Sequence, residues 1–154
     1  MSATPVPHLN FTGQAREALD FYAAAFGGRA VVRTYGDFGM PAGLPDTDRV
    51  VFGQVLADDG FSVMAYDVPG TDGGAARSGS TRREQGVTIT DQPFFLALSA
   101  DAIGTAQGWW DALSAGATTV EPLAASAWSA GFGMLTDRFG VTWVISVVDE
   151  HAQQ

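Results

Sequence analysis

The last strong stretch of the chain, GFGMLTDRFGVTWVISVV over residues 131–148, predicts two strands joined by a tight turn. An apolar run ends at Thr136, the turn lies at residues 137–140 (DRFG), and a β-branched run follows. Asp at the first turn position and Gly at the fourth are typical of a type I turn, because Asp accepts turn hydrogen bonds and Gly tolerates left-handed geometry. A similar hairpin lies upstream, where VVFGQVLADDGFSVMAYDV turns at residues 58–60. The chain therefore contains one hairpin motif twice.

Each hairpin follows a strand and a helix, so the repeated unit is larger than the hairpin. In the first unit we expect a strand at 5–11, a helix at 14–26, a strand at 29–35, a loop at 36–48 and the hairpin at 49–67. The helix is predicted by an apolar stripe at helical spacing, which consists of Ala15, Ala18, Leu19, Tyr22 and Phe26. Glycine directly after this stripe is typical of a helix end.

The second unit repeats this order, with a strand at 94–99, a helix at 102–115, a strand at 118–121 and the final hairpin. Asp101 is expected to cap the helix, Gly116 to end it, and its inward stripe to be Ile103, Ala106, Trp110 and Leu113. Each β-α-β-β-β unit is too small to bury its own sheet. We therefore predict an α+β fold in which modules 5–67 and 94–149 form one domain, a curved mixed sheet with the helices outside. A pocket is expected on the inner face of that sheet.

Residues 68–93 separate the two units and are rich in Gly, Ser, Thr, Arg and Asp without a hydrophobic period. Two interpretations remain open, because long segments of this kind inside a compact domain are either linkers or functional loops. The segment is either a flexible linker or a mobile loop over a site. In the second case Arg77, Arg82 and Arg83 would be available to an anionic ligand.

Composition excludes several classes of function. The 154 residues carry a formal net charge of −9, which disfavours nucleic-acid and anionic-membrane partners because phosphate would be repelled. The absence of cysteine excludes disulfides, thiolate metal sites and a cysteine nucleophile. The N-terminal stretch lacks the features of a signal peptide, and no run of about twenty apolar residues suits a membrane span. We therefore expect a cytoplasmic protein.

Three motifs in order resemble one protein family: PHLNFTGQAREALDFYAAAFGG, the segment around Trp128 and FGMLTDRFGVTWVISVV. They are similar to the vicinal oxygen chelate superfamily, which includes glyoxalase I, bleomycin-resistance proteins and extradiol dioxygenases. The resemblance covers about residues 5–149 and is greatest to the PhnB-like branch, whose members are often described as 3-demethylubiquinone-9 3-methyltransferase domains. It implies a homodimer with pockets near the contact between modules.

The metal site of this family is tested residue by residue. Metal-dependent relatives hold one divalent ion with His and Glu ligands from four strands, and the C-terminal ligand falls here on Val144. The internal repeat places the matching ligand on Met64, and the strand FFLAL at 94–98 offers none. His8 alone is a plausible ligand, since His151 lies in the polar tail. One ligand of four does not hold a divalent ion tightly, so we expect no metal.

No organic cofactor is expected either. The glycines between residues 70 and 74 lie in the linker rather than between a strand and a helix, so no phosphate-binding loop is predicted. The chain also has no Gly-x-Ser-x-Gly motif, and with two histidines a Ser-His-Asp triad is not expected.

Candidate ligand-binding residues lie on the strands expected to face inward. They are His8, Asn10, Phe52, Gln54, Met64, Tyr66, Trp128 and Val144. His8 and Asn10 share a face of the first strand and would orient a polar ligand, or else form an ordinary edge hydrogen bond. Phe52 and Gln54 share a face of the third strand, and Gln54 is either a ligand contact or is satisfied by a neighbouring backbone group. Trp128 lies in an Ala/Ser/Gly loop, where it would wall a pocket or a dimer interface.

Three functions remain open. The first is metal-independent binding of a small apolar or aromatic molecule by a PhnB-like homodimer, because ligand pockets are usually lined by apolar residues with few polar groups. The second is a metal-independent acid/base enzyme, an isomerase or transferase, in which His8 acts with Asn10 or Gln54. The third is a metal-dependent glyoxalase- or dioxygenase-type enzyme.

Overall fold

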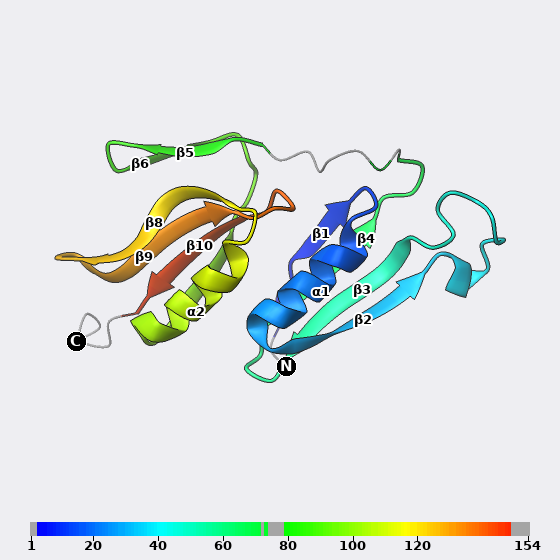
Figure 1. The fold of residues 1–154 in the computed structure, drawn as a ribbon, viewed down its shortest axis with the longest axis horizontal. Helices are drawn as coiled ribbons and strands as arrows, with labels where there is room; N and C mark the ends of the chain where they lie inside the picture. Colours follow the sequence, from blue (N-terminus) through cyan, green and yellow to red (C-terminus); the bar gives the residue numbers. More distant parts are fainter. Residues whose placement is uncertain (1–2, 72, 74–78, 149–154) are drawn as a thin grey trace. The chain divides into compact units, whose positions relative to one another are not determined.

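The computed structural model describes residues 3–71, 73 and 79–148. It divides into two compact units, residues 1–76 and 77–154 (Figure 1). Two residues weighed above, Arg77 and His151, lie outside the described residues. Neither of the two α-helices in the described part is long and apolar enough to cross a membrane.

The first unit is a four-stranded sheet with one α-helix. Its elements are β1 (His8–Phe11), α1 (Ala15–Phe26), β2 (Gly28–Thr34), the short 3-10 helix η1 (Gly36–Phe38), β3 (Val50–Ala57) and β4 (Ser62–Asp67). The strands are ordered β1-β4-β3-β2, with β1 parallel to β4 and the other pairs antiparallel. The predicted β-α-β-β-β order is confirmed.

The second unit has the same connectivity after a leading hairpin. Its elements are β5 (Thr81–Glu84), β6 (Val87–Thr90), β7 (Leu96–Ala100), α2 (Ile103–Leu113), β8 (Thr118–Ser126), β9 (Ser129–Thr136) and β10 (Thr142–Val147). The main sheet is ordered β7-β10-β9-β8, again with one parallel pair, β7 and β10. The predicted α+β class with two equivalent β-α-β-β-β units is confirmed.

Both predicted turns are present. The Gly140 N–H donates to the Asp137 carbonyl at 3.0 Å, and the Gly60 N–H donates to the Ala57 carbonyl at 3.1 Å. The two glycines have φ values of 85° and 95°, in the left-handed region that other residues rarely adopt. The Asp137 carboxylate accepts hydrogen bonds from three donors, the N–H groups of Phe139 and Val141 and the Nε1–H of Trp143.

Close approach of helix to sheet builds the core of each unit. The stripe predicted for α1 is buried, and Leu19 lies against β3 at Gly53, where a Cβ atom would collide with the Leu19 side chain. Gly133 has the same role in the second unit, because a Cβ atom there would lie 2.8 Å from the Trp110 ring. Helix α2 differs from its prediction, since Ile103 is 46% exposed. No side chain caps α2, because its N-cap is Ala102 and Asp101 lies one residue too early.

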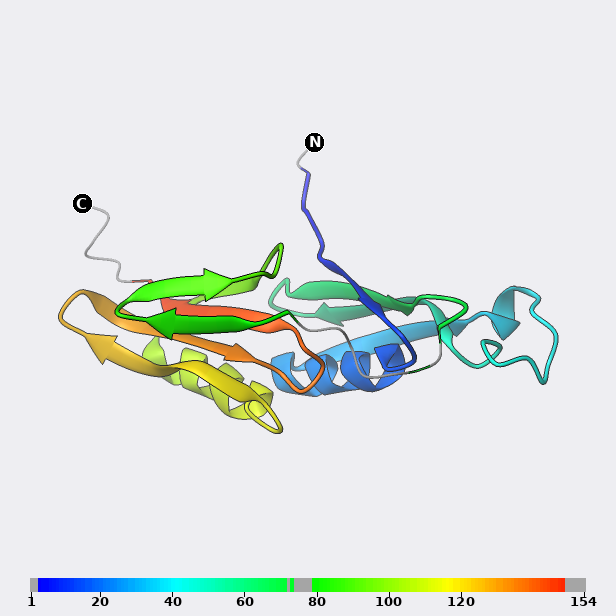
Figure 2. The same cartoon turned by 90° about the horizontal axis from the view of Figure 1, so that it is seen from above.

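The segment 68–93, expected as a linker or loop, contains the β5–β6 hairpin. Its residues TRREQGVTIT lack the apolar alternation that marks a half-buried strand, so the sequence does not predict it. Polar cross-strand contacts stabilise the hairpin instead, including a 2.8 Å hydrogen bond between the hydroxyls of Thr81 and Thr90. Its turn is formed by Gln85 and Gly86, both at positive φ. Figure 2 shows this hairpin and α2 on opposite sides of the second sheet.

Candidate functional site

One face of the first sheet collects six of the eight candidate residues. On β3, Phe52 and Gln54 alternate with Gly53, which faces α1, so both point to the side away from the helix. Gln54 is in register with Met64, and Met64 with His8, across three adjacent strands. Asn10 and Tyr66 form the next pair on the same face. We call the side of this sheet that faces away from α1 the open face.

Polar contacts on the open face link neighbouring strands. The Nδ1 atom of His8 lies 3.1 Å from Oδ1 of Asn10. In the tautomer that carries its proton on Nδ1, the imidazole donates to this amide oxygen, and Nε2 is left as an acceptor. The imidazole also meets the Tyr66 ring edge-on, with centroids 5.3 Å apart. The Gln54 side-chain amide donates to the Ser62 hydroxyl at 2.9 Å, so a side chain, and not a backbone group, is its partner.

The open face is partly exposed and chemically mixed. His8 and Asn10 are exposed, Met64, Tyr66 and Gln54 are half-buried, and Phe52 is 37% exposed. Two aromatic rings, a thioether and several neutral hydrogen-bonding groups thus lie within one patch. Such a patch suits a small molecule with an apolar body and a polar end.

The other two candidates lie in the second unit. Val144 is half-buried on β10, in register with Met134 on β9 and Ala97 on β7. Trp128 forms the two-residue turn between β8 and β9 with Ala127, and its side chain is 96% exposed. Within its own unit Trp128 therefore lines no pocket.

The equivalent face of the second sheet is covered by the β5–β6 hairpin. Phe132 and Met134 alternate with Gly133, which faces α2, so they point toward the hairpin side. The Arg83 guanidinium lies 5.1 Å from the centroid of the Phe132 ring, and its Nε lies 3.6 Å from the Glu121 carboxylate. The Thr88 hydroxyl reaches the Met134 sulfur at 3.8 Å, and Met134 is only 2% exposed.

The donor set does not fit the divalent metal that the family resemblance implies. The four strands in question place His8 beside Met64 and Ala97 beside Val144. One imidazole and no carboxylate occur among these four positions, whereas such ions need several nitrogen or oxygen ligands. Across residues 3–71, 73 and 79–148, no three His, Asp or Glu side chains are grouped so that they could hold a metal ion.

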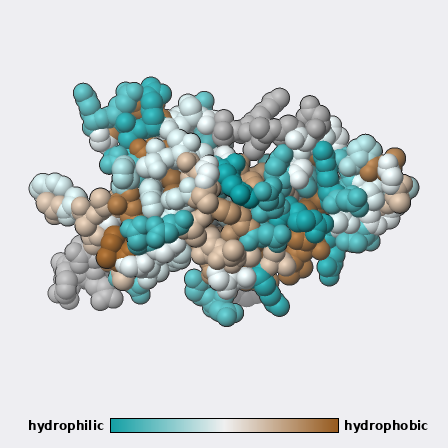
Figure 3. All heavy atoms as spheres, in the orientation of Figure 1, coloured by the Kyte–Doolittle hydropathy of each residue, from teal (hydrophilic) through white to brown (hydrophobic). Residues whose placement is uncertain are grey.

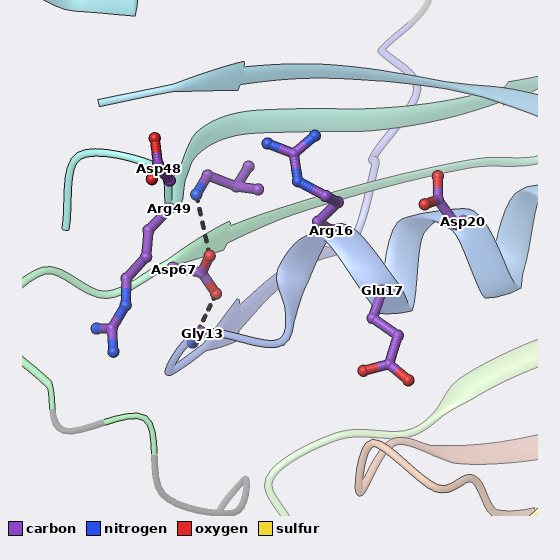
Figure 4. A pocket seen from close by; sticks show the side chains of 8 residues that line it. Gly13, Arg16, Glu17, Asp20, Asp48, Arg49 and Asp67 are labelled. Carbon is purple, nitrogen blue, oxygen red and sulfur yellow. Dashed lines mark hydrogen bonds between the residues drawn. The ribbon is translucent and has the colours of Figure 1, made fainter. Parts of the chain in front are cut away.

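A separate cavity of about 420 Å³, lined mostly by charged residues, opens on the helix side of the first unit (Figure 4). It lies where α1 begins, between Arg16 and Asp20 on the helix and Asp48 and Arg49 before β3. Figure 3 shows hydrophilic side chains gathered over this end of α1. None of the candidate residues of the open face lines this cavity.

Asp67 forms the floor of that cavity and has a structural role. Its Oδ1 accepts hydrogen bonds from the N–H groups of Gly13 and Ala15 at 2.8 and 3.0 Å, and its Oδ2 accepts one from Val50 at 3.0 Å. The residue is 1% exposed. With these three hydrogen bonds the buried Asp67 side chain joins the ends of β4, α1 and β3.

Two titratable groups near this region have shifted pKa values. Burial raises the pKa of the Tyr35 phenol above its ordinary value of 10.0, and the nearby charges of Tyr66, Asp46 and Asp67 raise it further, while Arg49 opposes them. The Tyr35 hydroxyl donates to the Asp67 carbonyl at 2.7 Å. The Asp37 carboxylate has a lowered pKa, chiefly because the Thr34 N–H donates to it at 2.8 Å.

Residues that the sequence analysis did not single out border the open face. Arg29 and Arg33 lie on the edge strand β2, in register with Leu56 and Phe52 on β3. The alternation Arg29, Val31, Arg33 was visible in the sequence, but only the strand order shows that it adjoins the candidate residues. Asp67 was likewise visible only as the last residue of a strand.

Comparison with known proteins gives matches along most of the chain. A family model described as the glyoxalase/bleomycin resistance protein/dioxygenase superfamily matches residues 6–145. Protein YjdN of Escherichia coli (strain K12) is 25% identical over 158 residues, covering 96% of this chain and 97% of that protein.

Solved structures of similar fold are also found. Protein PA1353 from Pseudomonas aeruginosa is 28% identical with a TM-score of 0.72, and the match covers 95% of this chain and 98% of that one. A PhnB protein from Bacillus cereus, described as a putative 3-demethylubiquinone-9 3-methyltransferase, is 20% identical with a TM-score of 0.67. That match covers 95% of this chain and all of the other, and it shows likeness of fold.

Proposed function

This chain belongs to the glyoxalase/bleomycin resistance protein/dioxygenase superfamily, and on that premise we propose that it binds a small apolar or aromatic molecule without a metal ion. The superfamily predicted from three sequence motifs is thereby confirmed, and a PhnB protein is among its structural neighbours. The superfamily contains many activities, so function depends on the residues of the open face and not on the fold.

The observation that carries the proposal is the register of the open face. Three strands bring His8, Met64 and Gln54 into one row, and Phe52 and Tyr66 lie beside that row. The rings of Phe52 and Tyr66 and the thioether of Met64 offer a large contact area to a flat apolar molecule. The polar groups of the row itself, His8 and Gln54, are few and neutral, as is usual among the groups that line a small-molecule site.

Metal independence is supported by the donor set. On the four strands that carry the ligands in metal-dependent relatives, His8 lies beside Met64 and Ala97 lies beside Val144. A thioether and two aliphatic groups do not replace the imidazole and carboxylate ligands that Zn²⁺, Ni²⁺ or Fe²⁺ require.

Native mass spectrometry of the untagged protein, purified without added metal, tests both parts of the proposal. The proposal is supported if the measured mass exceeds the mass of the polypeptide by that of a non-covalently bound organic molecule and no metal is present. That molecule can then be identified as the ligand. A stoichiometric divalent ion on every chain would contradict metal independence, and the metal-dependent enzyme would then become the leading function.

A second candidate is favoured by one observation, the hydrogen bond between His8 and Asn10. It orients the imidazole, and in the tautomer with the proton on Nδ1 it leaves Nε2 as an acceptor, as a general base requires. The discriminating test is solvent deuterium exchange into the ligand identified above. Exchange that is lost in His8→Ala, with ligand binding retained, supports an acid/base enzyme. The absence of exchange in wild-type protein supports binding alone.

We also propose that the protein is a homodimer in which Trp128 lies at the contact. An indole that is 96% exposed at a hairpin tip is a large apolar surface without a partner in its own unit. Aromatic residues are enriched in the centres of protein interfaces.

A further inference from the structure

We infer that the molecule bound on the open face is a small amphipathic anion, an aromatic or polycyclic carboxylate, whose acidic group is recognised by Arg29 and Arg33. This inference rests on the proposed function, because it names the chemical class of ligand for the same face. The residues that support the inference lie on the edge strand β2, which carries none of the metal-ligand positions of the family.

The arrangement of residues across the four strands carries the inference. Arg33 is in register with Phe52, and Arg29 with Leu56, so both guanidinium groups extend from the side of β2 that faces away from α1. Both arginines are exposed. Between them Val31 is in register with Gln54, and the row continues through Met64 to His8. The face therefore changes from cationic at β2, through apolar at its centre, to neutral polar at β1.

The positive charge of the β2 edge is unusual because the protein as a whole is acidic. The chain has 17 acidic and 8 basic residues. The rows of the open face on β1–β4 hold two arginines and no Asp or Glu; their members are Arg29, Val31, Arg33, Phe52, Gln54, Leu56, Ser62, Met64, Tyr66, His8 and Asn10. A local excess of positive charge attracts anions to this edge.

The two arginines form no ion pair within the described part of the chain, although the charge of Arg33 acts on the nearby Asp37 carboxylate. The single hydrogen bond of the Arg33 guanidinium goes to the Val32 carbonyl, at 3.2 Å. Asp37, the acid that Arg33 influences, accepts its hydrogen bond from the Thr34 backbone. Both guanidinium groups therefore retain donors for a carboxylate, which arginine binds in a two-pronged geometry.

The size of the face sets the size of the ligand. Adjacent strands lie about 4.8 Å apart, so β2 and β1 are separated by about 14 Å. The arginine side chains extend over part of that distance. The remainder accommodates one or two fused rings above Phe52 and Met64, with His8 and Gln54 at the far end for a hydroxyl or carbonyl group.

Isothermal titration calorimetry with two matched probes tests the inference. The probes are 2-naphthoate and 2-naphthylmethanol, which share the ring system and differ in charge. We expect wild-type protein to bind the carboxylate at least about tenfold more tightly than the alcohol, because a charge-assisted pair with arginine is added. In Arg29→Gln/Arg33→Gln this preference should disappear while the affinity for the alcohol is retained. Arg16→Gln, which changes an exposed arginine on α1 on the other side of the sheet, should leave both affinities unchanged.

The outcomes separate the inference from the function on which it rests. Equal affinity of wild-type protein for the two probes, unaffected by the double variant, would overturn the anionic class and leave an apolar binding face intact. Failure of both probes to bind, with no perturbation of the Met64 methyl resonance, would overturn both proposals. Loss of carboxylate affinity in Arg16→Gln, but not in the double variant, would move the anion to the helix side and also contradict the inference.

Discussion

Phe52 and Phe132 occupy equivalent positions in the two units, yet their surroundings differ. Each precedes the glycine that touches its helix, so each points to the side of its sheet away from that helix. The Phe52 ring is 37% exposed, whereas the Phe132 ring lies under the Arg83 guanidinium at 5.1 Å. Within its own unit the first face leaves Phe52 partly exposed, whereas the β5–β6 hairpin covers the equivalent face of the second unit.

Replacing Gly53 by alanine should destabilise the protein by about 1–3 kcal/mol, because the new Cβ atom would overpack the contact with Leu19 and would also lie 2.9 Å from the Ala65 carbonyl oxygen. Urea unfolding followed by circular dichroism measures the change. The matched control is Gly108→Ala in α2, where no atom lies within 4 Å of the added Cβ. That control should stabilise the protein by about 0.5–1 kcal/mol, since alanine is the better helix former. Equal effects at both sites would refute the role given to Gly53.

Removing the Asp67 carboxylate should cost about 3 kcal/mol or more, because Asp67→Ala leaves three backbone N–H groups without their acceptor. Asp67→Asn should cost less, since one oxygen remains. The free energy of unfolding measures both, and hydrogen exchange should report faster opening at Ala15 and Val50. Asp59→Ala is the control, because Asp59 accepts one exposed hydrogen bond, from Phe61. A loss at Asp67 no larger than at Asp59 would argue against the structural role.

Tyr35 should titrate at higher pH than an ordinary tyrosine. Its folded pKa is raised above 10.0, so the folded state holds the proton more tightly than the unfolded state. The protonated Tyr35 phenol therefore stabilises the folded state. This stabilisation is complete below about pH 10 and is lost as the pH rises through the pKa that Tyr35 has in the folded protein. Tyrosinate difference absorbance, recorded for wild-type protein and Tyr35→Phe, isolates the group. A difference spectrum that titrates at or below the ordinary tyrosine pKa would contradict the assignment.

Arg83→Gln should loosen the β5–β6 hairpin, because it removes the contact with Phe132 and the pair with Glu121. A partly exposed cation–π contact and ion pair contribute about 1 kcal/mol together. Hydrogen exchange at β5 and β6 should accelerate severalfold, and Met134 should become more accessible to oxidation. Arg82→Gln is the control, because Arg82 pairs only with the exposed Glu84 in the described part of the chain. Matching exchange rates in the two variants would contradict the role of Arg83 as an anchor.

Trp128→Ser should weaken the proposed homodimer without unfolding the chain, because the indole is 96% exposed and supports no core. Sedimentation velocity should show a shift from dimer toward monomer at micromolar concentration. Phe38→Ser, which changes another exposed aromatic residue, should leave the association unchanged. A wild-type monomer at every concentration would refute the dimer itself.

Much of the fold could be predicted from periodicity, because α1, β3 and β4 each bury one face and the buried side chains recur at the period of the element. Alternation also correctly placed His8 with Asn10 and Phe52 with Gln54 on shared faces. Arg29 and Arg33 could not be recognised in this way. An exposed arginine on a strand is ordinary, and its meaning depends on strand order and register, which are long-range properties.

The β5–β6 hairpin is the second feature that could not be predicted from the sequence. Threonine and arginine side chains stabilise it through polar contacts, and those contacts leave no hydrophobic period to detect. Its functional consequence, the burial of Met134, is also invisible until the hairpin is seen against the second sheet.

Asp67 has a consequence for the order in which the first unit can form. It ends β4, the last strand of that unit, but its carboxylate binds N–H groups at the start of α1, near the N-terminus. During synthesis the first turn of α1 therefore leaves the ribosome well before its acceptor exists. A nascent chain that stops before residue 67 has the helix but not the group that anchors its beginning. Completion of this unit is thus tied to the arrival of a single side chain.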